Sequence, residues 1–168
     1  MKTFPTVKLS SGLMLSSVLL LTACGNIITT DIRGTLGVTW NEAGHPEVIV
    51  QPCGLKIDWI SVGGNEGTDV DLLTESPPGG EFIVDLMDAD EPWAPRGDVV
   101  LKFSDSETVR FTGAKEWGDS QVGGILTTWN RVANLNEGEV LIGDTIDIDG
   151  SELEPHIVTR DYFSTCTD

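Results

Sequence analysis

Short apolar runs separated by turn residues make up the chain after residue 31. In residues 32–40 apolar and small or polar side chains alternate, which is the period-2 pattern of a strand with one buried face. Residues 41–45 are rich in turn formers, and residues 47–53 are again apolar, so the two runs predict a hairpin. Similar runs predict further strands at residues 55–62, 81–86, 98–103, 107–112, 124–129, 139–142 and 156–160.

Amphipathic segments of helical period are short, and residues 130–136 predict no more than a single helical turn. About nine strands at close spacing are typical of an all-β domain. The pattern favours an antiparallel β-sandwich, for example of the immunoglobulin-like kind, with a partly open barrel as the alternative.

The first 24 residues combine the features of a bacterial lipoprotein signal. Lys2 and Lys8 give a basic start, residues 9–21 are uncharged and rich in leucine, and Leu21-Thr22-Ala23-Cys24 resembles a lipobox. An apolar stretch of 13 residues is shorter than the roughly 20 that a spanning helix needs. We therefore expect residues 1–23 to be a signal peptide that is removed.

The thiol of Cys24 is then expected to carry the lipid, with fatty acyl chains such as palmitate. Two acyl chains anchor a protein stably where one does not, because each buried CH₂ contributes about 0.8 kcal/mol. The predicted organisation is a lipidated tether at residues 24–31 and a single β-domain at residues 32–168. The sequence therefore predicts a protein held by lipid on the outer face of the cell membrane.

The number of cysteines predicts a disulfide. Lipidation of Cys24 leaves Cys53 and Cys166, in a compartment that permits disulfides. A Cys53–Cys166 bond would close a loop of 113 residues and contribute about 4 to 5 kcal/mol in the chain-entropy model. A redox pair is the alternative, but the chain has no Cys-x-x-Cys spacing.

The net charge is strongly negative. Lys and Arg number 10 against 27 Asp and Glu, a net charge of −17, and removal of residues 1–23 takes away two lysines and leaves −19. Proteins bind nucleic acid largely by neutralising phosphates with Lys and Arg, so we expect no nucleic-acid partner.

Several motifs together resemble small, uncharacterised lipid-anchored β-domain proteins of actinobacterial envelopes. They are the lipobox, a strand ending in Cys53, Leu55-Lys56-Ile57-Asp58-Trp59-Ile60-Ser61-Val62, Trp129, Leu135-Asn136-Glu137-Gly138-Glu139-Val140 and Tyr162-Phe163-Ser164-Thr165-Cys166. The resemblance implies the location and the β-fold and transfers no active-site residue.

Nucleophilic catalysis has few candidate residues. A triad needs a histidine beside a serine, and the chain has His45 in a predicted turn and His156 at the start of the last predicted strand. The chain contains no Gly-x-Ser-x-Gly elbow, and Ser120 in Gly118-Asp119-Ser120-Gln121 only superficially resembles a lipase nucleophile block. We expect Ser120 to lie in a solvated turn.

Two carboxylate groupings are weak candidates for Ca²⁺. One comprises Asp85, Asp88, Asp90 and Glu91, and the other comprises Asp144, Asp147, Asp149 and Glu152. The second fails the EF-hand register, because the twelfth position falls on His156. We expect no dedicated metal or cofactor and interpret these residues as acidic edges that discourage aggregation.

Two of the five tryptophans are weak candidates for binding. Trp40, Trp59 and Trp129 lie in predicted strands and are expected in the core, whereas Trp93 and Trp117 lie in predicted loops. A loop tryptophan either stacks on a sugar ring or anchors a partner, or it covers the open end of the sheet.

The sequence therefore predicts a non-enzymatic binding or interaction module at the cell envelope, whose partner is an envelope protein or glycan. The alternatives are a small hydrolase that uses carboxylates and a calcium-dependent binding module. A carboxylate hydrolase depends on the separation of the two groups in space.

Overall fold

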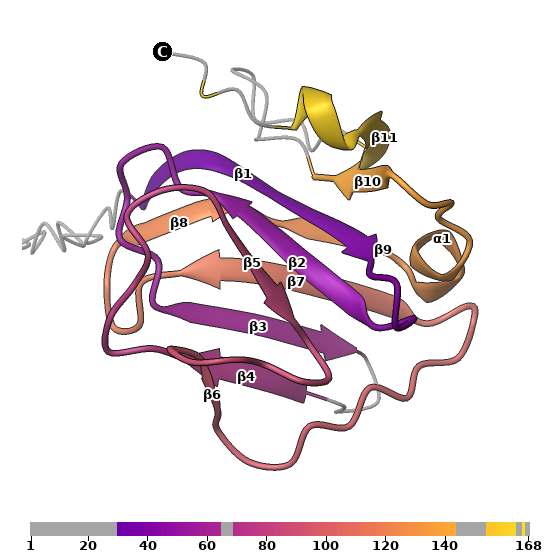
Figure 1. The fold of residues 1–168 in the computed structure, drawn as a ribbon, viewed down its shortest axis with the longest axis horizontal. Coiled ribbons are helices and arrows are strands. Elements are labelled where there is room, and N and C mark those ends of the chain that lie inside the picture. Colours follow the sequence, from indigo (N-terminus) through magenta and orange to yellow (C-terminus); the bar gives the residue numbers. More distant parts are fainter. Residues whose placement is uncertain (1–29, 65–68, 144–153, 164–165, 167–168) are drawn as a thin grey trace, which may run out of the picture.

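The computed structural model describes residues 30–64, 69–143, 154–163 and 166 (Figure 1). They form strands and two short helical segments. The elements are β1 (Asp31–Trp40), β2 (Pro46–Gln51), β3 (Trp59–Gly64), β4 (Asp69–Leu73), β5 (Phe82–Asp85), β6 (Ala94–Pro95), β7 (Thr108–Ala114), β8 (Ser120–Gly123), β9 (Ile125–Thr128), α1 (Trp129–Ala133), β10 (Glu139–Ile142), β11 (His156–Thr159) and the 3₁₀ helix η1 (Arg160–Tyr162).

All the strands belong to one hydrogen-bonded sheet. The longest path of neighbouring strands runs β11-β10-β1-β8-β7-β3-β4-β6. Off this path, β2 pairs with the other edge of β1, β5 pairs with β2, and β9 pairs with β7. The sheet curls into a half-barrel, with β2 and β5 in front of β7 and β3 (Figure 1). The prediction of an all-β fold is confirmed, and the prediction of a β-sandwich is wrong.

Strand β8 is the reason that the fold is not a sandwich. It runs parallel to β1, with Ser120 opposite Asp31, and antiparallel to β7, with Gln121 opposite Ala114. A sandwich needs two separate sheets, whereas β8 joins the two halves of this molecule side by side. The parallel β1–β8 pair also makes the sheet mixed, which corrects the prediction of a purely antiparallel arrangement.

The individual strands follow the sequence pattern in part. The β1–β2 hairpin is confirmed, with Val38 opposite Val48. Residues 98–103 form no strand, although Val99, Leu101 and Phe103 pack against the core. Strand β4 lies in a stretch for which the sequence predicts no strand, and β8 lies where we expected a turn.

The core fills the inside of the curl. Its fully buried side chains come from both halves of the sheet, and they include Leu36, Val48, Ile60, Leu72, Phe111 and Val122. A ring cluster closes one end, since Trp129 packs edge-on to Trp40 and tilted against Phe103, at centroid distances of 6.0 and 4.9 Å. The indole N–H of Trp40 donates to the carbonyl of Val132 at 2.7 Å and ties α1 to β1.

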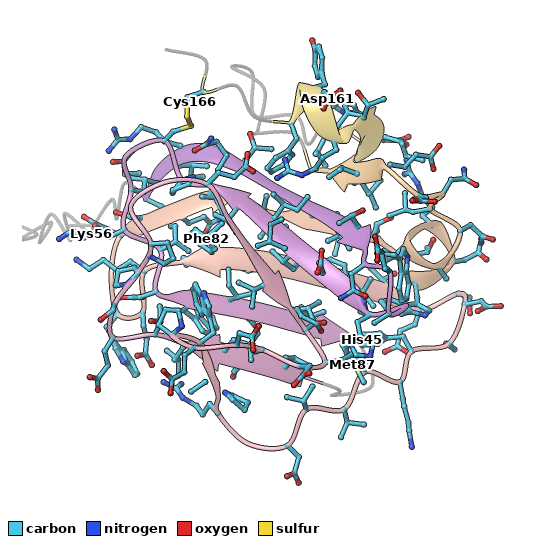
Figure 2. All side chains as sticks on the ribbon, in the orientation of Figure 1. His45, Lys56, Phe82, Met87, Asp161 and Cys166 are labelled. Atoms are coloured by element: carbon cyan, nitrogen blue, oxygen red, sulfur yellow. A yellow bond between two sulfur atoms is a disulfide. The ribbon has the colours of Figure 1, made fainter. Side chains whose placement is uncertain are left out.

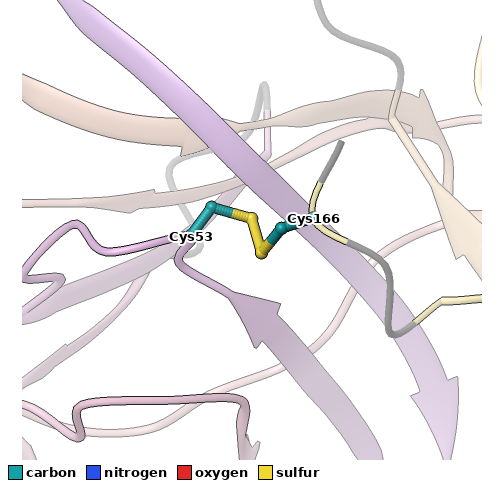
Figure 3. Close-up of a disulfide and its surroundings, with 2 residues drawn as sticks. All are labelled: Cys53 and Cys166. Carbon is teal, nitrogen blue, oxygen red and sulfur yellow. A yellow bond between two sulfur atoms is a disulfide. The ribbon is translucent and has the colours of Figure 1, made fainter. Parts of the chain in front are cut away.

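A disulfide joins Cys166 to Cys53, which follows strand β2. Cys53 and Cys166 are bonded, with their Cα atoms 5.7 Å apart, as Figure 3 shows. The predicted pairing is therefore confirmed.

A second, smaller core lies on the outer face beneath η1. It contains Ile49, Val140, Ile142 and Phe163. Gly37 on β1 lies opposite both Ile49 and Ile142, so one side chain is missing from the middle of this row. A Cβ at Gly37 would lie 2.7 Å from the Phe163 ring and 2.5 Å from Val140, so the ring occupies the space that a side chain would need.

We expect Gly37→Ala to displace the Phe163 ring and to lower the free energy of unfolding by about 1–3 kcal/mol, the usual cost of overpacking. Urea unfolding measures the change. Gly79→Ala is the matched control, because a Cβ there meets no atom within 4 Å, and its effect should stay within about 0.5 kcal/mol. Equal stabilities of the two variants would show that Phe163 is not packed against β1.

Candidate functional site

A hollow of about 400 Å³ lies along β5 and the loop that follows it. The loop leads from β5 to β6, that is, from one edge of the half-barrel toward the other. The hollow combines apolar and acidic side chains. Its lining is Glu47, Pro78, Phe82, Ile83, Val84, Asp85, Asp88, Asp90, Glu91, Pro92 and Trp93.

An aromatic stack forms the floor of the hollow. The rings of Phe82 and Trp93 lie 5.4 Å apart at an interplanar angle of 28°. Trp93 is only 6% exposed, so it covers the core instead of presenting its ring to a ligand. The stack joins β5 to the β5–β6 loop at the edge where no described strand pairs with β5.

Strand β5 presents one backbone edge to the hollow. Among the described strands it pairs with β2 alone. The N–H of Leu86 donates to the carbonyl of Pro46 at 3.0 Å, and hydrogen bonds of an antiparallel pair alternate along the strand. The backbone groups of Phe82 and Val84 therefore point to β2, and those of Ile83 and Asp85 point to the free edge.

Asp85 holds the end of β5 in place. One carboxylate oxygen accepts the N–H groups of Met87 and Asp88 at 2.8 and 3.0 Å. The other accepts the side-chain amide of Asn41 at 2.8 Å and lies 3.0 Å from Nδ1 of His45. The His45 ring and the backbone of Met87 thus both contact Asp85 at this end of the molecule (Figure 2).

These contacts set the charge of Asp85. Burial raises the pKa of its carboxyl group, but the hydrogen bonds from Met87, His45, Asp88 and Asn41 together outweigh burial and hold the pKa below its ordinary value. The Asn41 amide also donates to Glu47, which lies opposite Asp85 on β2, and so bridges two like charges. Asp85 is thus an ionised structural residue.

The remaining carboxylates of the hollow lie on the loop. In the described part of the chain the side chains of Asp88, Asp90 and Glu91 form no hydrogen bond and no ion pair. The described residues also include no group of three or more His, Cys, Asp or Glu side chains that could hold a metal ion. The other predicted carboxylate group, Asp144, Asp147, Asp149 and Glu152, lies outside the described residues, as does Cys24.

Ser120 does not meet either histidine. Ser120 lies opposite Asp31 at the start of β1, whereas His45 follows the end of β1. At about 3.3 Å per residue, the two ends of β1 are about 30 Å apart. His156 on β11 lies opposite Ile142 on β10, and Ile142 lies opposite Gly37 on β1. Gly37 is about 20 Å along β1 from Asp31, so His156 is also far from Ser120. The structure therefore brings no Ser–His pair together at Ser120.

Trp117 is the most exposed large apolar side chain in the described residues, at 95%. It occupies the third position of a turn in which the N–H of Gly118 donates to the carbonyl of Lys115 at 3.0 Å. Its φ of +56° lies in the left-handed region, which costs an ordinary side chain about 1–2 kcal/mol and which Gly or Asn usually fills.

Two features of these sites are missing from the sequence analysis. The open edge at Ile83 follows only from the pairing of β5 with β2, because the apolar run Phe82-Ile83-Val84 does not show which strand ends the sheet. The role of Asn41 and His45 as partners of Asp85 joins positions about 40 residues apart and leaves no local signal.

Comparisons of the chain with protein-family models, curated proteins and solved structures find no match. The resemblance to actinobacterial envelope lipoproteins therefore stays a prediction. No helix among the described residues has the length and apolar character needed to cross a bilayer.

We expect Asp85→Asn to lower the free energy of unfolding at neutral pH by about 1–3 kcal/mol, since it weakens hydrogen bonds to a charged acceptor. The folded pKa lies below the unfolded value of about 3.9, so the contribution of the carboxylate is complete above about pH 4 to 5 and is lost as the pH falls through the folded pKa. Urea unfolding of both proteins at several pH values should show the difference shrinking in acid.

Asp90→Asn is the control for this prediction, because its side chain makes no contact with the β1–β2 turn. A difference between wild type and Asp85→Asn that persists unchanged in acid would mean that the charge of Asp85 does not stabilise the fold.

Proposed function

We propose that the protein is a non-enzymatic binding module, tethered by lipid on Cys24 to the outer face of the cell membrane. The lipobox and basic start of the chain support the anchor. The Cys53–Cys166 disulfide supports an oxidising compartment, because such bonds persist mainly outside the cytoplasm. The partner is a protein of the envelope.

One observation carries the binding role: β5 is an edge strand that borders a hollow. The outward N–H and C=O groups of Ile83 and Asp85 offer the hydrogen bonds that an added strand uses. Ile83 is 47% exposed beside them, so it supplies apolar contact area. An extended segment of the partner adds to the sheet along β5.

The charge of the hollow selects the partner segment. Glu47, Asp85 and the three loop carboxylates line it, and no Lys or Arg is among its lining residues. Complementary charge accelerates encounter and disfavours acidic competitors. The segment therefore carries Lys or Arg and alternates them with aliphatic residues, as a strand with one apolar face does.

The anchor is tested by growing cells with labelled palmitate. The mature protein should retain the label, lack residues 1–23 and be recovered with membranes, whereas Cys24→Ser should be unlabelled. An unlabelled wild-type protein that keeps its leader contradicts the anchor.

The binding mode is tested with a synthetic peptide of alternating Lys and Val residues. We expect Ile83→Pro to weaken its binding at least about fivefold, because proline removes an outward N–H worth about 1 kcal/mol while leaving the β2 pairing intact. Titration by fluorescence measures the affinity. A peptide with Glu in place of Lys should not bind.

Ile157→Pro is the matched control. Ile157 is 49% exposed on β11, which among the described strands pairs only with β10. Its N–H also points away from the neighbouring strand, because the N–H of Arg160 donates to Gly138 at the inward position. None of the residues that line the acidic hollow belongs to β11, so Ile157→Pro should bind the peptide normally. Equal binding by both variants contradicts strand addition at β5.

A further inference from the structure

We propose that Trp117 inserts into the headgroup region of the lipid bilayer and seats the domain on the membrane. This inference rests on the lipid anchor at Cys24. Tryptophan prefers the boundary between lipid and water, because its ring is large and apolar and its N–H needs a polar partner. The 95% exposure of the Trp117 side chain leaves the whole ring available for such a contact.

The fold places Trp117 next to the start of the domain. The N–H of Asp31 donates to the carbonyl of Asp119 at 2.6 Å, and Asp31 lies opposite Ser120 in the β1–β8 pair. Trp117 thus lies two residues before Asp119, whose carbonyl accepts the hydrogen bond from the start of β1. Six residues lie between Cys24 and Asp31, and the seven residue steps from one to the other span at most about 25 Å when extended. A lipid on Cys24 therefore keeps the turn of Trp117 within reach of the bilayer.

The turn that carries Trp117 is fixed to the body of the protein. The N–H of Lys115 donates to the carbonyl of Ser120 at 2.9 Å. The N–H of Glu116 donates to the carboxylate of Asp58 at 2.5 Å, and the Glu116 carboxylate pairs with Arg96. These bonds hold the indole ring away from the core, in a left-handed conformation that tryptophan seldom adopts. An outward-facing ring kept in a costly conformation is typical of a contact site.

The charge near this turn suits a lipid surface better than the charge of the hollow does. At the turn, Lys115 and Arg96 balance Glu116 and Asp119. At the start of β1, Arg33 pairs with Asp31, so the charge here is balanced, whereas no Lys or Arg lines the hollow. Strand β5 ends by the β1–β2 turn, at the opposite end of β1, so Asp85 and Asp88 lie far from Trp117.

The test uses the full, lipidated protein reconstituted into phosphatidylcholine vesicles, with and without brominated acyl chains that quench tryptophan at short range. The wild-type protein should show quenching and a blue shift of its emission, because Trp117 is the exposed tryptophan of the described residues, whereas the other four are buried or half-buried. Trp117→Asn should lose both while still floating with the vesicles. Asparagine tolerates the left-handed conformation, so this variant keeps the turn.

The matched control adds Met87→Trp to Trp117→Asn. Met87 is exposed and its N–H contacts Asp85 at the opposite end of β1, so the new tryptophan should not be quenched (Figure 2). Wild-type protein that floats without quenching, or a Met87→Trp control quenched as strongly as wild type, would overturn the seating and leave the anchor intact. A shift of Trp117 emission by soluble N-acetylglucosamine oligomers, without quenching by lipid, would overturn it in favour of a glycan site. Protein that carries no acyl chain and does not float would overturn the anchor and, with it, this inference.

Discussion

The backbone pairing of β8 determines the architecture of this protein. Ser120–Gly123 runs between β1 and β7, parallel to one and antiparallel to the other. Without it the chain would present two antiparallel groups of strands, β5-β2-β1 and β7-β3-β4, each needing a separate partner for its apolar face. With it the two groups form one sheet that curls around a shared core. The half-barrel is thus the geometry that lets one sheet cover both sides of its own interior.

Among the described strands, the edges at β4 and β5 differ in how they are covered. At β4 the edge is covered by the two-residue strand β6. At β5 no described strand follows, and only the stack of Phe82 on Trp93 spans the gap to the loop that leads to β6. Exposed edges invite unwanted pairing, and negative charge next to an edge opposes it between identical copies of the chain. The carboxylates around β5 therefore act in two ways, because charge that repels a second copy attracts a basic segment.

The sequence predicts those parts of the fold in which local pattern and structure agree. The β1–β2 hairpin has alternating apolar residues and a turn, and the disulfide follows from cysteine parity once Cys24 is assigned to lipid. Strand β8 could not be predicted, because it is short and Val122 is its only buried large side chain. The run 98–103 has the apolar pattern of a strand but packs on the core without pairing. For the site, the acidic composition was visible, whereas the open edge at Ile83 depends on pairing between distant residues and leaves no local pattern.

The Cys53–Cys166 bond has a consequence for proteolysis. Strands β3 to β11 lie inside the loop that it closes, as does the exposed connection after β5. A protease that cuts this connection once breaks the backbone but releases no fragment, because the two pieces stay covalently joined through the sulfur atoms. Such a nick would pass unnoticed on a gel run without reductant, and the nicked molecule would still carry its C-terminal piece.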